Sequence, residues 1–224
     1  MSGLRIALIH ALPESPEPAN RAFAELWPQA ARFNLMDDSL APDLAAAGSI
    51  TPEITQRFLD LAHYAARTGA RGILFTCSAF GGPIDACKAA LGQGPDPVPV
   101  LKPNEAALET ALGAGSRIAL LATFGPTIPS MTAELDTLAR AKGVVPTIVT
   151  RVVDGALAAL KAGNGEEHDR LVAQAAAELP PVDAVVLTQF SMARAASSIA
   201  AVKGRRVLTT PASAVLKLKT LVRA

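Results

Sequence analysis

The sequence repeats itself at an offset of 112 residues, and this repeat limits the folds that the chain can adopt. Residues 4–9 (LRIALI) return as residues 116–121 (SRIALL), and residues 70–80 (ARGILFTCSAF) return as residues 182–192 (VDAVVLTQFSM). Each copy alternates short apolar runs with segments of helical periodicity, which is typical of a parallel sheet covered by helices. The repeat therefore predicts an α/β protein of two pseudo-symmetric lobes, each a small, mostly parallel sheet flanked by helices.

The first copy contains most of the predicted elements. Apolar runs at residues 4–10, 32–36 and 97–101 predict strands, and residues 19–27 predict a helix after a loop that contains three prolines. Thr51–Pro52 suits the cap and the first position of a second helix, because Thr accepts from a free N–H and Pro has none to leave unpaired.

The repeat also predicts where the lobes begin and end. We expect the first lobe to comprise residues 1–102 and 206–224, and the second to comprise residues 103–205. Ligands of open α/β sheets bind beyond the carboxyl ends of the strands. If the lobes face each other about a pseudo-twofold axis, the turns at residues 76–78 and 188–190 line one cleft, which is the predicted active site.

The segment from Ile73 to Gly82 (ILFTCSAFGG) carries the clearest signal for chemistry. Its apolar start predicts a buried strand, the next residues predict a tight turn, and Pro83 opens an Ala-rich segment that favours a helix. Cys77 then lies near a helix N-terminus, where unpaired N–H groups favour an anion. We expect a lowered pKa and a useful thiolate fraction at neutral pH. The alternative is a small buried cysteine that packs against the strand end.

Composition argues against several functional classes. The 21 basic and 20 acidic side chains nearly balance, so nothing favours binding to nucleic acid or to an anionic membrane. The apolar runs are shorter than the roughly 18 to 20 residues that cross a bilayer, and Arg5 interrupts the region where a signal peptide needs its apolar core. We therefore expect a cytoplasmic protein.

The cysteines and histidines do not form a metal-binding pattern. Cys77 and Cys87 are ten residues apart without a CxxC motif, and His10, His63 and His168 are scattered without paired ligand spacing. We expect neither a metal site nor a disulfide. Cys87 is predicted to lie in the core, and His63 and His168 are predicted to lie at the surface or to be hydrogen-bonded.

The repeat and three motifs resemble the aspartate/glutamate racemase superfamily, which includes glutamate and hydantoin racemases, maleate isomerase and arylmalonate decarboxylase. The motifs are TCSAFG at residues 76–81, LLATFGPT at residues 120–127 and LTQFSMA at residues 187–193, and the resemblance covers essentially the whole chain. It implies two lobes, no cofactor, a small carboxylate substrate, and two cysteines that face each other across the substrate α-carbon. Family members often pair, so the resemblance also admits a homo-oligomer.

By this resemblance Cys77 matches the first catalytic cysteine, and Gln189 stands where the second is expected. An amide has no pKa near neutrality, so Gln189 can form hydrogen bonds but cannot exchange a proton. Ser78 and Ala79 match the turn that holds a substrate carboxylate, and Thr123 matches the polar residue that closes the first strand of the second lobe. The other predicted pocket residues are His10, Pro13, Phe124, Thr188, Phe190 and Ser191.

Several of these residues have a second interpretation. Gln189 is as well suited to satisfying backbone groups, and His10 to bonding only within its own loop. The hydroxyls of Ser78, Thr123, Thr188 and Ser191 are expected to supply donors for an enolate-like intermediate. Three phenylalanines beside the site, Phe80, Phe124 and Phe190, suit a partly apolar substrate.

These features lead to three functional hypotheses. The first is a cofactor-independent racemase or isomerase that acts at the α-carbon of a small carboxylate, such as an amino acid or a derivative, with the thiolate of Cys77 as its one acid/base. The second is a decarboxylase or lyase of the same superfamily, which needs only one proton carrier and so accommodates Gln189. The third is a non-catalytic protein that binds small acids.

Overall fold

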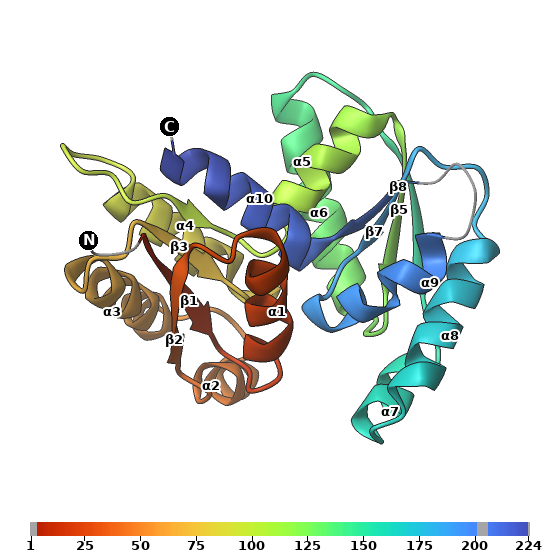
Figure 1. Cartoon of the computed structure of the whole chain (residues 1–224), viewed down its shortest axis with the longest axis horizontal. Helices are drawn as coiled ribbons and strands as arrows, with labels where there is room; N and C mark the ends of the chain where they lie inside the picture. The colour runs from red at the N-terminus through yellow and green to blue at the C-terminus, as the bar shows by residue number, and fades with distance from the viewer. Residues whose placement is uncertain (1–3, 201–205, 224) are drawn as a thin grey trace. The chain divides into compact units, whose positions relative to one another are not determined.

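Two four-stranded parallel sheets form the framework of the chain. In the computed structural model, which describes residues 4–200 and 206–223, the strand orders are β2-β1-β3-β4 and β6-β5-β7-β8 (Figure 1). Every strand pair in both sheets is parallel. The same order occurs twice in the same sequence direction, which confirms the predicted α/β fold with two similar lobes.

The first unit builds its sheet from the first half of the chain. Its strands are β1 (Arg5–His10), β2 (Ala31–Met36), β3 (Gly72–Phe75) and β4 (Val100–Leu101). Its helices are α1 (Pro16–Leu26), α2 (Leu40–Ala47), α3 (Pro52–Arg67) and α4 (Gly81–Leu91), with the 3-10 turn η1 (Ser78–Phe80) before α4.

Helix starts in this unit follow from their first residues. Thr51 caps α3 by accepting a hydrogen bond from the Ile54 N–H at 3.3 Å, as predicted. Helix α1 begins at Pro16, three residues earlier than predicted, so Pro16 and Pro18 are helical and not part of the preceding loop. Prolines are tolerated there because the first helical turn needs no N–H donors.

Both faces of the first sheet are covered. On one face, Ala7 and Ile9 of β1 share a buried cluster with Phe58 of α3 and Ile84 of α4. On the other face, helix α10 (Thr210–Arg223) approaches β3 at Gly72, where a Cβ would lie 2.9 Å from Val222 Cγ2 and 3.0 Å from Leu218 Cδ1. Only a glycine at this position permits the close packing of α10.

The second unit repeats this arrangement. Its strands are β5 (Arg117–Ala122), β6 (Thr147–Val152), β7 (Ala184–Leu187) and β8 (Arg206–Thr209). Its helices are α5 (Glu105–Ala114), α6 (Thr127–Ala141), α7 (Ala156–Lys161), α8 (Gly165–Ala177) and α9 (Ala196–Ala200), with the 3-10 segment η2 (Phe190–Ala195) before α9. One buried cluster joins β5 and β7 to α7, α8 and η2, and another joins the opposite face of the sheet to α5 and α6.

The boundary between the units differs from the predicted one near the C-terminus. The first unit comprises residues 1–103 and 214–224, and the second comprises residues 104–213. Strand β8 was assigned to the first lobe by the predicted boundary at residue 206, but it pairs with β7 and completes the second sheet. The chain therefore returns to the first unit only within α10.

Candidate active site

The turn that carries Cys77 is held on both sides by aromatic packing. Phe75 ends β3 and Phe80 ends η1, and both rings contact Phe58 of α3, at centroid distances of 5.1 Å and 4.8 Å. Phe75 and Phe80 are buried, whereas Cys77 between them is half-buried and has an extended backbone. The aromatic cluster packs against the end of the strand and the turn before the helix, while Cys77 itself stays partly exposed.

The surroundings of Cys77 disfavour its thiolate. Burial raises the pKa of the thiol above its ordinary value of 9.0, and a hydrogen bond from the backbone N–H of Ala79 offsets only part of this shift. The predicted lowering of this pKa is therefore wrong. The reason is burial, which outweighs the single N–H donor; the 3-10 turn η1 also separates Cys77 from α4, which begins only at Gly81.

Cys87 differs from Cys77 in its position and its exposure. It lies within α4, its side chain is fully buried, and burial raises the pKa of its thiol to about 12. The prediction that Cys87 is a core residue is confirmed.

A chain of polar hydrogen bonds ends at Thr76, the residue before Cys77. His10 Nδ1 lies 2.8 Å from Thr76 Oγ1, and His10 Nε2 lies 2.8 Å from Asn34 Oδ1. Asn20 of α1 donates from Nδ2 to the same Asn34 oxygen at 3.0 Å. His10 is only 1% exposed, so its bond to Thr76 joins the ends of β1 and β3 in the interior of the first unit, whereas Asn34 at the other end of the network is exposed.

The network defines the protonation of His10. Asn34 Oδ1 can only accept, so His10 Nε2 carries a hydrogen. Burial lowers the pKa of His10, and the bond to Asn34 opposes this effect only in part, so the ring is neutral at pH 7. His10 Nδ1 then accepts from the Thr76 hydroxyl. Both ring nitrogens are occupied within the protein, and His10 offers no ring nitrogen to a ligand.

In the second unit, Gln189 forms a pair with Thr123. Gln189 Oε1 accepts from the Thr123 N–H at 2.7 Å and from the Thr123 hydroxyl at 3.0 Å. Because a backbone N–H can only donate, the amide oxygen must be the atom that faces Thr123. The NH₂ group of Gln189 is therefore the end of the amide that is left to donate. The residue equivalent to Cys77 is thus held through its amide oxygen, and an amide is neither an acid nor a base near neutrality.

The other predicted pocket residues differ in exposure. Thr188 is 1% exposed, and its hydroxyl donates to the Leu121 carbonyl at 2.8 Å, so it ties the end of β7 to β5 and has no proton to offer a ligand. Phe190 is buried, whereas Phe124 is 51% exposed. Half-buried side chains are Ser78 and Ser191, and exposed ones are Pro13 and Ala79. Phe80, expected beside the site, belongs instead to the buried cluster of the first unit.

Sequence reasoning misses Asn34 and Asn20. Asn34 interrupts the strand β2 between Phe33 and Leu35, and asparagine is depleted in strands, which is a signal that it has another role. Its partner follows only from the parallel register of β1 and β2 and from the position of α1, neither of which a local pattern reveals.

Of the two predicted states of His168, surface or hydrogen-bonded, the structure shows the second for one ring nitrogen. His168 is fully buried in α8, with Nδ1 2.8 Å from Asp169 Oδ1 and no hydrogen-bond partner for Nε2 within the described part of the chain.

Residues 4–200 and 206–223 contain no group of three His, Cys, Asp or Glu side chains placed to hold a metal ion. In the same residues, no helix combines the length and the apolar character that crossing a membrane requires.

Comparison with known proteins identifies the family of the chain. A family model for Asp/Glu/hydantoin racemases matches residues 18–218, which is most of the chain. The chain belongs to the Asp/Glu/hydantoin racemase family. No protein of curated function matches its sequence.

Solved structures of this racemase family and its neighbours share the fold. Allantoin racemase from Klebsiella pneumoniae is 20% identical with a TM-score of 0.75, and the alignment covers 98% of this chain and 88% of that one. A glutamate racemase from Bacillus anthracis is 14% identical with a TM-score of 0.71, covering 98% and 82%. Arylmalonate decarboxylase is 16% identical with a TM-score of 0.67, covering 97% and 92%. At these identities the likeness establishes the fold of this racemase-family chain and not its reaction.

The buried His10 network predicts a pH dependence of stability. The pKa of His10 is lowered in the folded state, so the unfolded chain binds more protons below the ordinary value of 6.5. Stability is therefore complete above that value and falls as the pH drops towards the folded-state pKa. Each unit of lowering corresponds to about 1.4 kcal/mol. Urea denaturation at pH 7.5 and pH 5.5 should show this loss in the wild type, and it should be reduced in the His10→Gln variant.

A matched control is His63→Gln, on the half-buried surface of α3, which should keep the wild-type dependence. The two pH values of the test lie above the ordinary carboxyl pKa values of 3.8 for Asp and 4.5 for Glu. The ion-paired Asp and Glu residues would change the free energy of unfolding only at lower pH. An unaltered pH dependence in His10→Gln would contradict the assignment of a neutral His10.

Proposed function

We propose that this racemase-family chain is a cofactor-independent enzyme that exchanges a proton at the α-carbon of a small carboxylate, with Cys77 as its one acid/base. The observation that supports this role is the contrast between the two thiols. Cys77 is half-buried at a turn between a strand and a helix, whereas Cys87 is fully buried within α4. Of the two cysteines, Cys77 is the one that is partly exposed.

In the proposed step, the thiolate of Cys77 takes the proton from the substrate α-carbon. The C–H bond breaks, the S–H bond forms, and the electron pair moves into the carboxylate to give an enediolate. This intermediate needs hydrogen-bond donors already in place, and one such donor is commonly worth about 3 kcal/mol of barrier. The Ser78 hydroxyl beside Cys77 is one supply.

We further propose that the NH₂ group of Gln189 is a second donor to the same substrate. Its support is the pair with Thr123, which uses the amide oxygen and leaves the NH₂ end to donate. That both turns serve one substrate rests on the internal repeat and on the family motifs at residues 76–81 and 187–193. A cytoplasmic location, a small carboxylate as the partner, and the absence of nucleic-acid and membrane partners remain predictions from the sequence.

A decarboxylase or lyase is the second candidate, and the raised pKa of Cys77 favours it. A neutral thiol donates a proton more readily than it takes one. In this alternative the bond from the α-carbon to a second carboxylate breaks and releases CO₂, and the electron pair forms the enediolate. Cys77 then protonates the carbon from one face and regains its proton from water. Gln189 needs no acid/base function in such a cycle.

The first test compares the two cysteines. In deuterated water, the wild type should exchange the α-proton of one member of a panel of amino acids, hydantoins, maleate and malonates, read out by mass spectrometry. Cys77→Ala should abolish the exchange because no proton carrier remains, and the expected loss is at least about a hundredfold. Cys87→Ala is the matched control and should retain activity. Full exchange in Cys77→Ala would refute the catalytic role, and binding without exchange in the wild type would indicate a non-catalytic binder.

The pH profile separates the two candidate reactions. With a Cys77 pKa above 9.0, a reaction that begins with proton abstraction should speed up about tenfold per unit of pH from 7 to 9, because kcat/KM follows the thiolate fraction. A decarboxylation that uses the thiol as donor should keep its rate over the same range and lose it above the pKa. Measuring kcat/KM from pH 6 to pH 10 distinguishes the two reactions.

Restoring a second thiol tests whether both turns contact one substrate. Gln189→Cys should add proton exchange from the opposite face, so that the enzyme forms the mirror-image product about a hundredfold faster than the wild type. Chiral chromatography measures this product. Gln189→Ser, similar in size but without a thiol, is the control and should show no gain. If the Gln189→Cys variant still exchanges the α-proton through Cys77 but forms no mirror-image product, this would contradict the proposal that both turns contact one substrate.

A further inference from the structure

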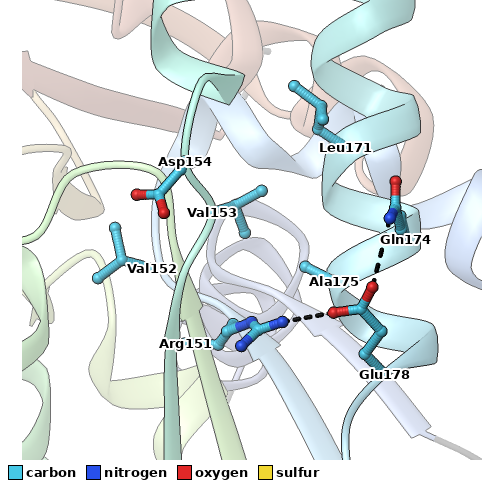
Figure 2. Close-up of a pocket in the computed structure, with 8 residues that line it drawn as sticks. All are labelled: Arg151, Val152, Val153, Asp154, Leu171, Gln174, Ala175 and Glu178. Carbon is cyan, nitrogen blue, oxygen red and sulfur yellow. Dashed lines mark hydrogen bonds and ion pairs between the residues drawn. The ribbon is translucent and has the colours of Figure 1, made fainter.

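A pocket of about 260 Å³ opens in the second unit between the end of β6 and helix α8. Figure 2 shows its lining, with the ion pair of Arg151 and Glu178 at one end, Asp154 at the other, and Val153 and Ala175 between them. None of the lining residues belongs to the set predicted for the active site. Its volume lies just below the roughly 300–1,000 Å³ of most ligand sites, which suits a small molecule.

The strand that lines the pocket differs from its counterpart in the first repeat. Arg151 of β6 pairs in register with Leu121 of β5, and Leu35 of β2 pairs in the same way with Ile9 of β1. Leu35 and Arg151 are therefore equivalent positions of the repeat. Leu35 packs against the core of the first unit, but Arg151 extends its guanidinium to Glu178. A leucine that fills space in one unit is thus an arginine at the edge of a hollow in the other.

On the helix side, too, a leucine of the first unit has a different residue as its counterpart in the second. Each of the four buried residues of α3 has a buried counterpart in the α8 region at an offset of 114. The same offset makes Ala175, which is also buried, the counterpart of the half-buried Leu61. Leu61 packs against the core of the first unit, whereas the smaller Ala175 forms part of the pocket wall. The matched pairs that establish this offset are Ile54 and His168, Phe58 and Val172, Ala62 and Ala176, and Ala65 and Leu179.

The charged side chains that line the pocket determine which ligand charge fits it. Glu178 accepts from Arg151 and from Gln174 Nε2, the latter at 3.3 Å, so the charges of Arg151 and Glu178 balance each other. Asp154 is exposed, and within residues 4–200 and 206–223 no hydrogen bond or ion pair is recorded for its carboxylate. One positive and two negative side chains leave the lining with a net charge of −1. A cation therefore fits this pocket better than an anion.

We propose that this pocket binds a small organic amine with a single positive charge and one acceptor oxygen. The ammonium pairs with Asp154, the hydrocarbon part lies against Val153, Leu171 and Ala175, and Arg151 donates to the acceptor oxygen. Arg151 has N–H groups besides the one bound to Glu178, so it can donate without breaking the ion pair. A ligand carboxylate at the same place would be repelled by Glu178. This site is separate from the proposed reaction and does not depend on it.

The test uses four probes of one chain length on the Cys77→Ala protein, in which turnover at the active site is removed. The probes are 4-aminobutanamide, 4-aminobutanoate, butylamine and butanoate. The methyl NMR signals of Leu171 and Ala175 report binding at the pocket itself. We expect 4-aminobutanamide to bind with a dissociation constant on the order of 1 mM, the zwitterion about tenfold more weakly, butylamine in between, and butanoate not at all.

Two variants assign the binding to these residues. Asp154→Asn keeps the shape of the side chain and should weaken 4-aminobutanamide about tenfold, whereas Asp136→Asn, on the exposed face of α6, should not change it. The double variant Arg151→Leu with Ala175→Leu introduces the pair of leucines found in the first unit and should abolish the methyl shift of Leu171, the reporter that this variant keeps. The proposal would be overturned if no methyl signal shifts at a probe concentration of about 10 mM. Tighter binding of the zwitterion or the anion, or unchanged binding in Asp154→Asn, would also overturn it.

Discussion

The candidate site depends on the parallel, in-register pairing of the two central strands in each sheet. In a parallel pair, both strands end at the same edge, so the residues that follow them meet there. The Thr76 N–H donates to the Ile9 carbonyl at 3.1 Å, and the Thr188 N–H donates to the Leu121 carbonyl at 3.0 Å, 112 residues further on. Each of these bonds closes a strand end and places the next side chain, a thiol in one unit and an amide in the other.

The same backbone supports different chemistry in its two copies. In the first unit, His10 and Thr76 satisfy each other, and Cys77 is left with one N–H donor and a raised pKa. In the second unit, the side chain of Gln189 is held by Thr123. The two copies therefore share one backbone fold, but only the first carries a side chain at this position that can exchange a proton. This asymmetry is why we favour a reaction with one proton carrier over a two-base racemisation.

Divergence between the copies also has consequences away from the strand ends. Two leucines that pack against the core of the first unit have an arginine and an alanine as counterparts in the second, and both counterparts line a pocket. Arg151 turns its guanidinium towards Glu178, and Ala175 is smaller than its leucine counterpart, so the lining differs in both charge and size from the matching place in the first unit. A repeat thus gives an internal reference for recognising a site that the overall fold does not reveal.

The sequence by itself determined the α/β class, the two lobes, the cap of α3 and the position of Cys77 at a turn, because each depends on local periodicity or on a repeat visible along the chain. Only the tertiary structure decided the pKa of Cys77, the occupied ring of His10, the orientation of the Gln189 amide and the assignment of β8 to the second sheet. These properties depend on burial and on partners far away in sequence, such as Asn34 for His10, and no local pattern encodes either. The expected lowering of the Cys77 pKa failed for this reason, since burial outweighed a single N–H donor.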